Sequence, residues 1–272
     1  MQGRKITIDN HALLLIVLKK LEIFPISSSI KRRKFDLFDS LISSGMKFRS
    51  GDIIVISSKY VSMSEGSLLK LDKIKVSNKA RTIAAMFEMD PKIAEITLRE
   101  SDYILGGIPG FLLSIRDGMI APNAGIDKSN VPPGFVIPYP NDAFKTAENL
   151  RLKFLLNCMI RVGIVIADSR LMPTRIGTVG VAIACSGFEP VEDERGKKDL
   201  FGNSLRVTFR AVADGLAATG VAIMGEGSES IPAVVVRGFK VTPTDRKLSK
   251  HDMAIDPKQD IYIRGLKRPP KL

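Results

Sequence analysis

The sequence of 272 residues contains no tryptophan and only two histidines and two cysteines. His11 and His251 lie far apart in the sequence, which excludes a zinc site built from histidine and cysteine. Two cysteines are too few for a disulfide framework, and Cys158 and Cys185 each lie in an apolar run. We therefore predict that both are buried small hydrophobic residues in a reducing, cytoplasmic compartment. Buried thiols also argue against a Cys/His nucleophile pair.

The sequence also lacks a hydrophobic run long enough to span a membrane. The apolar run at residues 12–18 is far shorter than the ~20 residues that a membrane-spanning helix needs. Lys19 and Lys20 follow it, where a signal peptide would have small residues before its cleavage site. We therefore expect no membrane partner, and we predict a strand that enters the core at residues 12–18.

The composition is that of a globular protein, 44% hydrophobic and 26% charged, but the formal net charge is +12. Residues 1–50 carry ten Lys and Arg against four Asp and Glu, and residues 240–272 carry nine against four. A protein that reads nucleic acid usually places its positive charge on a folded face, so nucleic acid is not an expected partner. The basic ends are interpreted either as solvated surface, as contacts for acidic partners, or as a site for an anionic ligand near the basic run 31–34.

Hydrophobic periodicity predicts a mixed α/β fold in which strands and helices alternate irregularly. Strands are predicted at residues 21–26, 53–56, 162–167, 179–184 and 233–236, with 261–263 as a further short strand. Helices are predicted at residues 35–42, 78–89, 91–100, 142–157 and 205–220. The centre of the chain, about residues 106–134, and residues 241–260 are expected to be loops. No linker-like change in composition divides the chain into separate domains.

Acidic and polar side chains gather in three segments of the kind that carries binding groups. Residues 123–130 contain a carboxylate, a hydroxyl and two amides, although an Asx turn would also explain them. Asp168 and Ser169 follow a buried strand, where the carboxylate would either hold a hard cation or cap a helix. Residues 224–230 combine glycines that admit a phosphate with acids that could hold a metal. With no Walker A loop or dinucleotide fingerprint, this oxygen-rich chemistry favours Mg²⁺ or Mn²⁺ beside a phosphate.

A longer series of motifs joins these segments in sequence order. The series comprises Phe24-Pro25-Ile26, Gly51-Asp52-Ile53-Ile54-Val55, Ser58-Lys59, Val61-Ser62, Glu65-Gly66, Arg99-Glu100-Ser101, Asn123-Ala124-Gly125-Ile126-Asp127, Ser129-Asn130-Val131, Asp168-Ser169, Gly177, Val179-Gly180-Val181-Ala182-Ile183, Asp193, Arg195-Gly196, Asp199, Phe201-Gly202, Ala211-Val212-Ala213-Asp214, Met224-Gly225 and Val236-Arg237-Gly238. In order and spacing it resembles the coenzyme F420-0:L-glutamate ligase family, whose members add γ-linked glutamate to a deazaflavin coenzyme.

The resemblance implies a mixed α/β homodimer that uses GTP and two divalent cations, Mg²⁺ or Mn²⁺, with K⁺ as a further candidate ion. The implied reaction activates a carboxylate of the deazaflavin coenzyme precursor as an acyl phosphate, which the amine of L-glutamate then attacks. Divalent cations suit this chemistry because they neutralise the charge on phosphate and carboxylate. The resemblance divides the chain into an N-terminal extension (1–20), a γ-glutamyl ligase-like domain (21–240) and a basic, polar C-terminal segment (241–272).

The resemblance also assigns roles to individual positions. Asp127, Asp168, Ser169 and Glu226 are expected to be metal ligands, with Ser169 in place of a threonine and Glu226 in place of a glutamine. The expected nucleotide contacts are Ser29, Ile30, Ser58, Lys59, Asn130, Met224, Gly225, Gly227 and Ser228.

The sequence departs from the family pattern at three places. Met63 stands where the family usually has a lysine, and a methionine cannot pair with a phosphate. Ser28-Ser29-Ile30 and the segment 170–175 also differ from the family's motifs. These departures keep two alternatives open, a divergent ligase that joins an amino acid to another carboxylate and a non-catalytic protein that binds the coenzyme or nucleotide.

Overall fold

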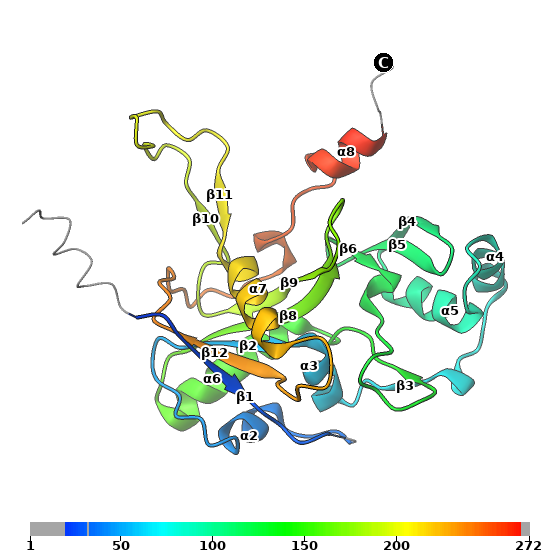
Figure 1. Ribbon diagram of the computed structural model, residues 1–272, viewed down its shortest axis with the longest axis horizontal. Helices are drawn as coiled ribbons and strands as arrows, with labels where there is room; N and C mark the ends of the chain where they lie inside the picture. The colour runs from blue at the N-terminus through cyan, green and yellow to red at the C-terminus, as the bar shows by residue number, and fades with distance from the viewer. Residues whose placement is uncertain (1–19, 32, 268–272) are drawn as a thin grey trace, which may run out of the picture.

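The computed structural model describes residues 20–31 and 33–267, and its core is a five-stranded mixed sheet (Figure 1). The strands lie in the order β1-β12-β2-β8-β9. Their bounds are Glu22–Ile26 (β1), Ile53–Ser57 (β2), Gly163–Leu171 (β8), Thr178–Ser186 (β9) and Ala233–Arg237 (β12). Strands β2 and β8 are parallel, and the other neighbours in the sheet are antiparallel. The mixed α/β class and the five core strands predicted from the sequence are confirmed.

The middle strands are continuous apolar runs because helices cover both faces of the sheet. Helices α2 (Leu37–Ile42) and α6 (Ala143–Cys158) pack on one face, where Ile54 is fully buried. Helix α7 (Val212–Met224) packs on the other face against Val55. Asp142 caps α6 as predicted, accepting a hydrogen bond from the amide of Lys145 at 2.9 Å. The sheet is therefore a rigid platform from which loops emerge.

A smaller lobe lies beside the sheet, at the right of Figure 1. Its elements are β3 (Leu69–Lys70), η1 (Leu71–Lys73), α4 (Asn78–Met86), α5 (Pro91–Glu100), β4 (Tyr103–Ile108), β5 (Phe111–Arg116), β6 (Met119–Pro122), η2 (Asn123–Gly125) and β7 (Phe135–Val136). The two predicted helices are confirmed, although α4 ends three residues early. The prediction of a loop-rich centre is wrong for residues 106–122, because β4, β5 and β6 form an antiparallel sheet, and it is confirmed for the irregular residues 126–134. Gly110 and Gly118 adopt φ of +84° and +79° in the tight turns between these strands, so they mark hairpins instead of a long loop.

An arm, residues 191–211, projects from the sheet at the upper left of Figure 1. In it β10 (Val191–Asp193) pairs antiparallel with β11 (Phe209–Ala211). The predicted helix at 205–220 is therefore wrong in its first part, because the backbone of residues 209–211 pairs with β10 and α7 begins at Val212. Phe209, one of the apolar residues at helical spacing, is 52% exposed, so the spacing does not reflect a buried face there.

The C-terminal segment crosses the molecule as a mostly irregular chain. Residues 241–260 form loops as predicted, apart from the single turn η3 (Lys250–Asp252). The predicted strand at 261–263 is wrong, because these residues begin helix α8 (Ile261–Lys267). The Asp260 carboxylate accepts a hydrogen bond from the amide of Ile263 at 2.7 Å, a helix-capping contact that a three-residue apolar run does not reveal.

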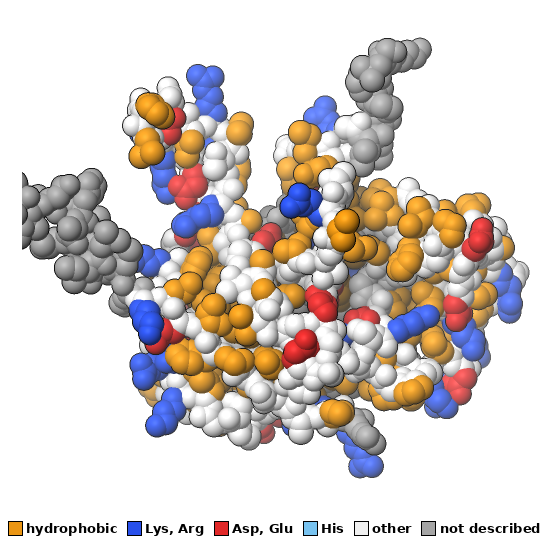
Figure 2. All heavy atoms as spheres, viewed as in Figure 1, with side chains coloured by type: hydrophobic (Ala, Val, Ile, Leu, Met, Phe, Trp, Pro, Cys, Tyr) orange, Lys and Arg blue, Asp and Glu red, His pale blue; other side chains and the backbone are white. Residues whose placement is uncertain are grey.

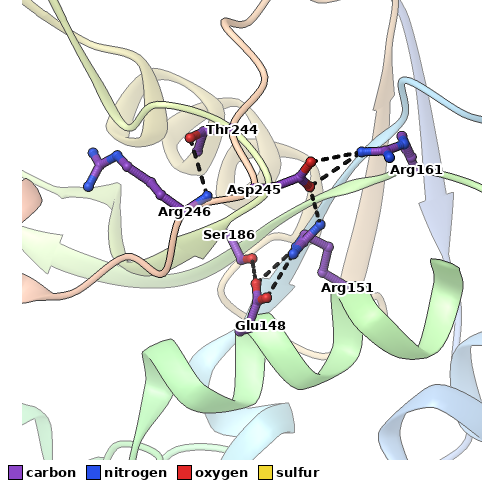
Figure 3. Close-up of polar contacts among 7 residues, drawn as sticks. All are labelled: Glu148, Arg151, Arg161, Ser186, Thr244, Asp245 and Arg246. Atoms are coloured by element: carbon purple, nitrogen blue, oxygen red, sulfur yellow. Dashed lines mark hydrogen bonds and ion pairs between the residues drawn. The ribbon is translucent and has the colours of Figure 1, made fainter. Parts of the chain in front are cut away.

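An ion-pair network fastens the start of this segment to helix α6 (Figure 3). The Arg151 guanidinium is buried and donates to both oxygens of Glu148, at 2.9 and 2.7 Å, and to Asp245 at 2.9 Å. Arg161 pairs with the same Asp245 at 3.0 Å, and the Ser186 hydroxyl at the end of β9 donates to Glu148. The network joins α6, β9 and the C-terminal segment, so we assign it to stability.

The two cysteines differ in how deeply they are buried. Cys185 is buried as predicted, but Cys158 is only partly buried, because it is the last residue of α6 and reaches the edge of the core.

The strand predicted at residues 12–18 lies outside the described residues. Within residues 20–31 and 33–267, no helix has the length and apolar character that crossing a membrane requires.

Candidate functional site

The carboxyl ends of the two parallel strands form the base of the candidate site. Ser57, the last residue of β2, lies opposite Ala167 of β8. Asp168 and Ser169 were predicted to follow this strand, but β8 continues through both to Leu171, because they pair with Val181 and Gly180 of β9. The Ser58 hydroxyl donates a hydrogen bond to Asp168 at 3.1 Å. Ser58 is also the first residue of helix α3 (Ser58–Glu65), which the sequence analysis did not predict. The carboxyl ends of the strands are where ligands commonly bind in sheets with parallel strands.

Asp168 accepts a second hydrogen bond from the hydroxyl of Tyr139, at 2.5 Å. Burial raises the pKa of the Asp168 carboxyl, and the nearby charge of Asp127 raises it further, against the effect of the two hydroxyl donors. Burial also raises the pKa of Tyr139 well above its usual value, and the Asp168 charge adds to this. Tyr139 is therefore a neutral donor that fixes the orientation of the carboxylate.

Asp127 lies in the loop after η2, where its carboxylate pairs with a positively charged side chain. Its carboxylate pairs with the Lys59 ammonium at 2.6 Å and accepts from the amide and hydroxyl of Ser129, at 2.7 and 2.9 Å. Burial acts to raise the pKa of Asp127, but Lys59 and Ser129 outweigh it and lower the pKa. The contact with the Ser129 amide is the Asx turn named as an alternative. Because Lys59 comes from α3, however, the loop is also tied to the base of the site.

Glu226 lies in the loop that follows helix α7. Its carboxylate accepts from the hydroxyls of Ser169 and Thr178, at 3.0 and 2.8 Å. The side-chain amide of Asn130 donates to the Gly227 carbonyl at 2.8 Å, so the loop of Asp127 closes onto the loop of Glu226. Three segments far apart in the sequence are thereby joined by side-chain contacts.

These loops surround a cavity of about 780 Å³. All the predicted site residues except Ser58 line it, and Ser58 lies behind it against Asp168. Those that line it are Ser29, Ile30, Lys59, Asp127, Asn130, Asp168, Ser169, Met224, Gly225, Glu226, Gly227 and Ser228. The structure therefore brings both predicted sets, metal ligands and nucleotide contacts, to one place.

The donor chemistry of the cavity suits hard divalent cations, because carboxylate and hydroxyl oxygens dominate around Asp127, Asp168 and Glu226. Within the described part of the chain, however, no three carboxylate, histidine or cysteine side chains converge to hold a metal ion. The predicted ligands therefore fit sites of the Mg²⁺ type, in which one or two carboxylates share the ion with water and substrate phosphates.

Several residues of the site were not among those predicted from the sequence. Tyr139 and Thr178 gave no local signal, because each lies far along the chain from the carboxylate that it contacts. Tyr139 is 29 positions from Asp168, and Thr178 is 48 positions from Glu226. Lys31 and Met63 also line the cavity. The predicted basic run 31–34 indicated the first of these, and the family pattern indicated the second.

The chain is similar in sequence to a family of known proteins over most of its length. The family model described as F420-0:Gamma-glutamyl ligase matches residues 29–238. A protein of Methanopyrus kandleri, named coenzyme F420:L-glutamate ligase, is 39% identical over 224 residues, which is 82% of this chain and 89% of that protein. A protein of the same name from Archaeoglobus fulgidus is 36% identical over 92% of this chain and 99% of its own length. Another from Methanothermobacter thermautotrophicus is 40% identical over 75% of this chain and 81% of its own.

Proposed function

Because this chain belongs to the F420-0:gamma-glutamyl ligase family and is a ligase, we propose that it joins L-glutamate to the deazaflavin coenzyme F420-0 with GTP as the energy source. The observation that carries the proposal is the 780 Å³ cavity, in which oxygen donors from strand β8 and from the Asp127 and Glu226 loops meet a helix N-terminus. We place the reaction in the cytoplasm, in keeping with two free cysteines.

The nucleotide phosphates would bind where α3 begins. The first amides of an α-helix attract anions, and the side chain of Ser57, which precedes α3, makes no capping hydrogen bond to them. Lys59 lies in the first turn and adds positive charge, and Lys31 lines the same cavity. Gly225, at φ of +73°, turns the chain out of α7 and opens the loop opposite.

Two divalent cations, Mg²⁺ or Mn²⁺, would be held by Asp127, Asp168 and Glu226, with the Ser169 hydroxyl as a further oxygen. K⁺ is a third candidate ion in the same cavity. When bound, such cations neutralise the negative charge on phosphate and carboxylate as they approach each other. Tyr139 and Ser58 keep the Asp168 carboxylate oriented toward the cavity, and Asn130 keeps the Glu226 loop closed.

The proposed chemistry has two steps. A carboxylate oxygen of the coenzyme attacks the terminal phosphorus of GTP, and the bond to GDP breaks, which gives an acyl phosphate. The amine of L-glutamate then attacks the acyl carbon, loses a proton, and expels phosphate as the amide forms. Lys59 and the α3 N-terminus stabilise the negative charge on the transferred phosphoryl group, and the closed loops hold the reactants in line.

We also propose that the protein is a homodimer. The arm presents large apolar side chains to solvent, with Leu200 fully exposed and Phe201 92% exposed (Figure 2). A two-stranded hairpin without a core of its own is marginally stable in water, so a second copy of the chain would stabilise it. Measuring the mass of the protein in solution tests this part of the proposal, and a monomer at all concentrations would contradict it.

The ligase activity is tested by incubating the purified protein with F420-0, L-glutamate, GTP and Mn²⁺ and measuring product mass. A mass increase of one or more glutamate residues, with GDP release, supports the proposal. A parallel reaction with ATP identifies the preferred nucleotide. Binding of F420-0 and GTP without turnover would instead indicate a non-catalytic binding protein.

A divergent ligase that acts on another carboxylate is a second candidate, and Met63 favours it. Met63 lines the cavity at a position where the family usually has a lysine. If a cation is needed there, Met63→Lys should tighten GTP binding about tenfold, a gain of about 1.4 kcal/mol. Met86→Lys, on the exposed side of α4, is the matched control. Unchanged GTP affinity in Met63→Lys would show that Lys59 and Lys31 suffice and would remove this argument for divergence.

A further inference from the structure

A second cavity of about 660 Å³ lies at the edge of the sheet, between β9, the β4-β5-β6 lobe and the C-terminal segment. Its volume is within the range of small-molecule sites. Its walls are mainly apolar, and the large side chains among them include Phe111, Phe144, Met119, Met172, Met253 and Tyr262. Aromatic rings and thioethers form favourable contacts with a flat aromatic ligand.

Several of these apolar walls are open to solvent. Phe111 is 53% exposed, Met172 42%, Ile255 53% and Tyr262 58%. Exposed large apolar side chains that gather in a concave surface mark a binding site, since they gain free energy when a ligand covers them.

The C-terminal segment closes one side of this cavity and is fastened there by close contacts. Lys250 lies 3.8 Å from Asp117, in the turn between β5 and β6. In the same turn, a Cβ atom on Gly118 would lie 2.7 Å from the Cβ of Ala254, so only glycine permits this approach. The family model ends at residue 238, and Met253, Ile255 and Tyr262 all come from the chain beyond it.

Strand β8 separates the second cavity from the first. Ser169 lines the first cavity and Arg170 lines the second, and neighbouring residues have Cα atoms about 3.8 Å apart. The Arg170 guanidinium donates to the Ile120 carbonyl at 2.6 Å, which fixes it beside β6. Its charge also acts to lower the pKa of Tyr139, so it lies within electrostatic reach of the Asp168 site. A ligand in the second cavity would therefore have a cation between it and the carboxylates of the first.

We propose that the second cavity binds the flat aromatic ring system of the coenzyme while the carboxylate of the same molecule lies in the first cavity. This inference rests on the proposed function, because it takes a deazaflavin as the acceptor. Arg170 then faces the acidic part of the acceptor that passes β8, and the C-terminal segment supplies one wall of the ring site. Substrate selection thus involves residues outside the region that the family model covers.

Binding of a deazariboflavin, which carries the ring system but no reactive carboxylate, tests the inference through its fluorescence polarisation. Ile255→Asp places a charge in the apolar wall, and Tyr262→Ala removes an aromatic contact. Both residues are more than half exposed, so the fold should tolerate either change. Ile176→Asp is the matched control, because Ile176 is fully exposed in the turn between β8 and β9 and does not line the cavity.

We expect Ile255→Asp to weaken deazariboflavin binding at least tenfold and Tyr262→Ala to weaken it severalfold. GTP affinity and the Ile176→Asp control should match the wild type. Equal ring affinity in all four proteins, with normal ligase activity in the wild type, would overturn the inference and leave the proposed function intact. Ring binding that is lost in Ile255→Asp, from a wild type that transfers no glutamate, would overturn the function and support the ring site.

A second copy of the chain is the competing occupant of this apolar surface. If Ile255→Asp lowers the mass of the protein in solution but leaves the ring affinity unchanged, the cavity is a contact between copies and the inference is wrong. If the mass is unchanged while the ring affinity falls, the small-molecule assignment is supported.

Discussion

Two carboxylates, Glu95 in the smaller lobe and Asp168 in strand β8 of the sheet, have opposite environments. Glu95 of α5 is buried and accepts from the amide and hydroxyl of Ser77, at 2.9 and 2.6 Å, and from Arg99 at 2.7 Å. These donors lower the pKa of Glu95 to about 2. Asp168 accepts from two neutral hydroxyls, and burial raises its pKa.

The difference separates a carboxylate that stabilises the fold from one that is available for chemistry. The charge of Glu95 is matched by the donors around it, which join α4 and α5. The charge of Asp168 is disfavoured where it lies, and a buried group with a shifted pKa beside a cavity is a candidate for function. A cation in that cavity would favour the charged form, as the proposed metal site requires.

The largest expected effect is on activity in Asp168→Asn. The amide keeps the shape of the side chain but removes the negative charge, so glutamate transfer should fall more than about a hundredfold, beyond what orienting residues of metal sites usually cause. Melting temperature, measured alongside, should stay the same or rise, because an unfavourable buried charge is lost. Asp193→Asn, on the exposed arm, serves as the control. Full activity in Asp168→Asn would remove this residue from the site.

Glu95→Gln should have the reverse outcome. Hydrogen bonds to charged groups contribute about 1.5–3 kcal/mol each, and glutamine keeps only part of this set, so the free energy of unfolding should fall by about 2 kcal/mol. Glutamate transfer at a temperature where the variant is folded should be unchanged. Denaturant unfolding and the ligase assay together check both halves. A loss of activity without a loss of stability would mean that Glu95 acts in the reaction and not in the fold.

A smaller effect is expected in Tyr139→Phe, which removes the hydroxyl that orients Asp168. Groups that orient metal ligands typically contribute 10–100-fold to affinity or activity, so we expect about a tenfold loss of glutamate transfer. The Mn²⁺ concentration at half-maximal activity should rise with it. Tyr60→Phe is the control, because Tyr60 lines the cavity but its hydroxyl contacts Ser28 and Ser40 instead of Asp168. Equal losses in both variants would indicate a general packing effect.

The sequence predicted the sheet because its central strands are continuous apolar runs rich in β-branched residues, a pattern typical of a sheet covered on both faces. It also predicted Asp127, Asp168 and Glu226, through motif order. It could not predict the contacts of Tyr139 or Thr178, because these depend on tertiary structure. It failed where local signals are ambiguous: the glycines of 106–118 occur in hairpins as well as in loops, and Leu205 and Phe209 mimic a helix face while lying in the arm.

The stability of the two variants should depend on pH in opposite ways, in protein stripped of metal with a chelator. The pKa of Glu95 is lower in the folded state than the usual value of about 4.3, so its contribution is complete above that pH and is lost as pH falls toward 2. The destabilisation caused by Glu95→Gln should therefore shrink as pH falls from 5 to 2.

Asp168 has the opposite sign. Its folded pKa lies above the usual value of about 3.9, so the folded state binds its proton more tightly and loses stability as pH rises past that value. Relative to the wild type, Asp168→Asn should therefore gain stability as pH rises from 3 to 6, while Glu95→Gln loses it. Melting temperatures of both variants over this range check the signs. If the melting temperatures of the two variants changed with pH in parallel, the two carboxylates would lie in equivalent environments. The distinction between Glu95 in the smaller lobe and Asp168 in the sheet would then be wrong.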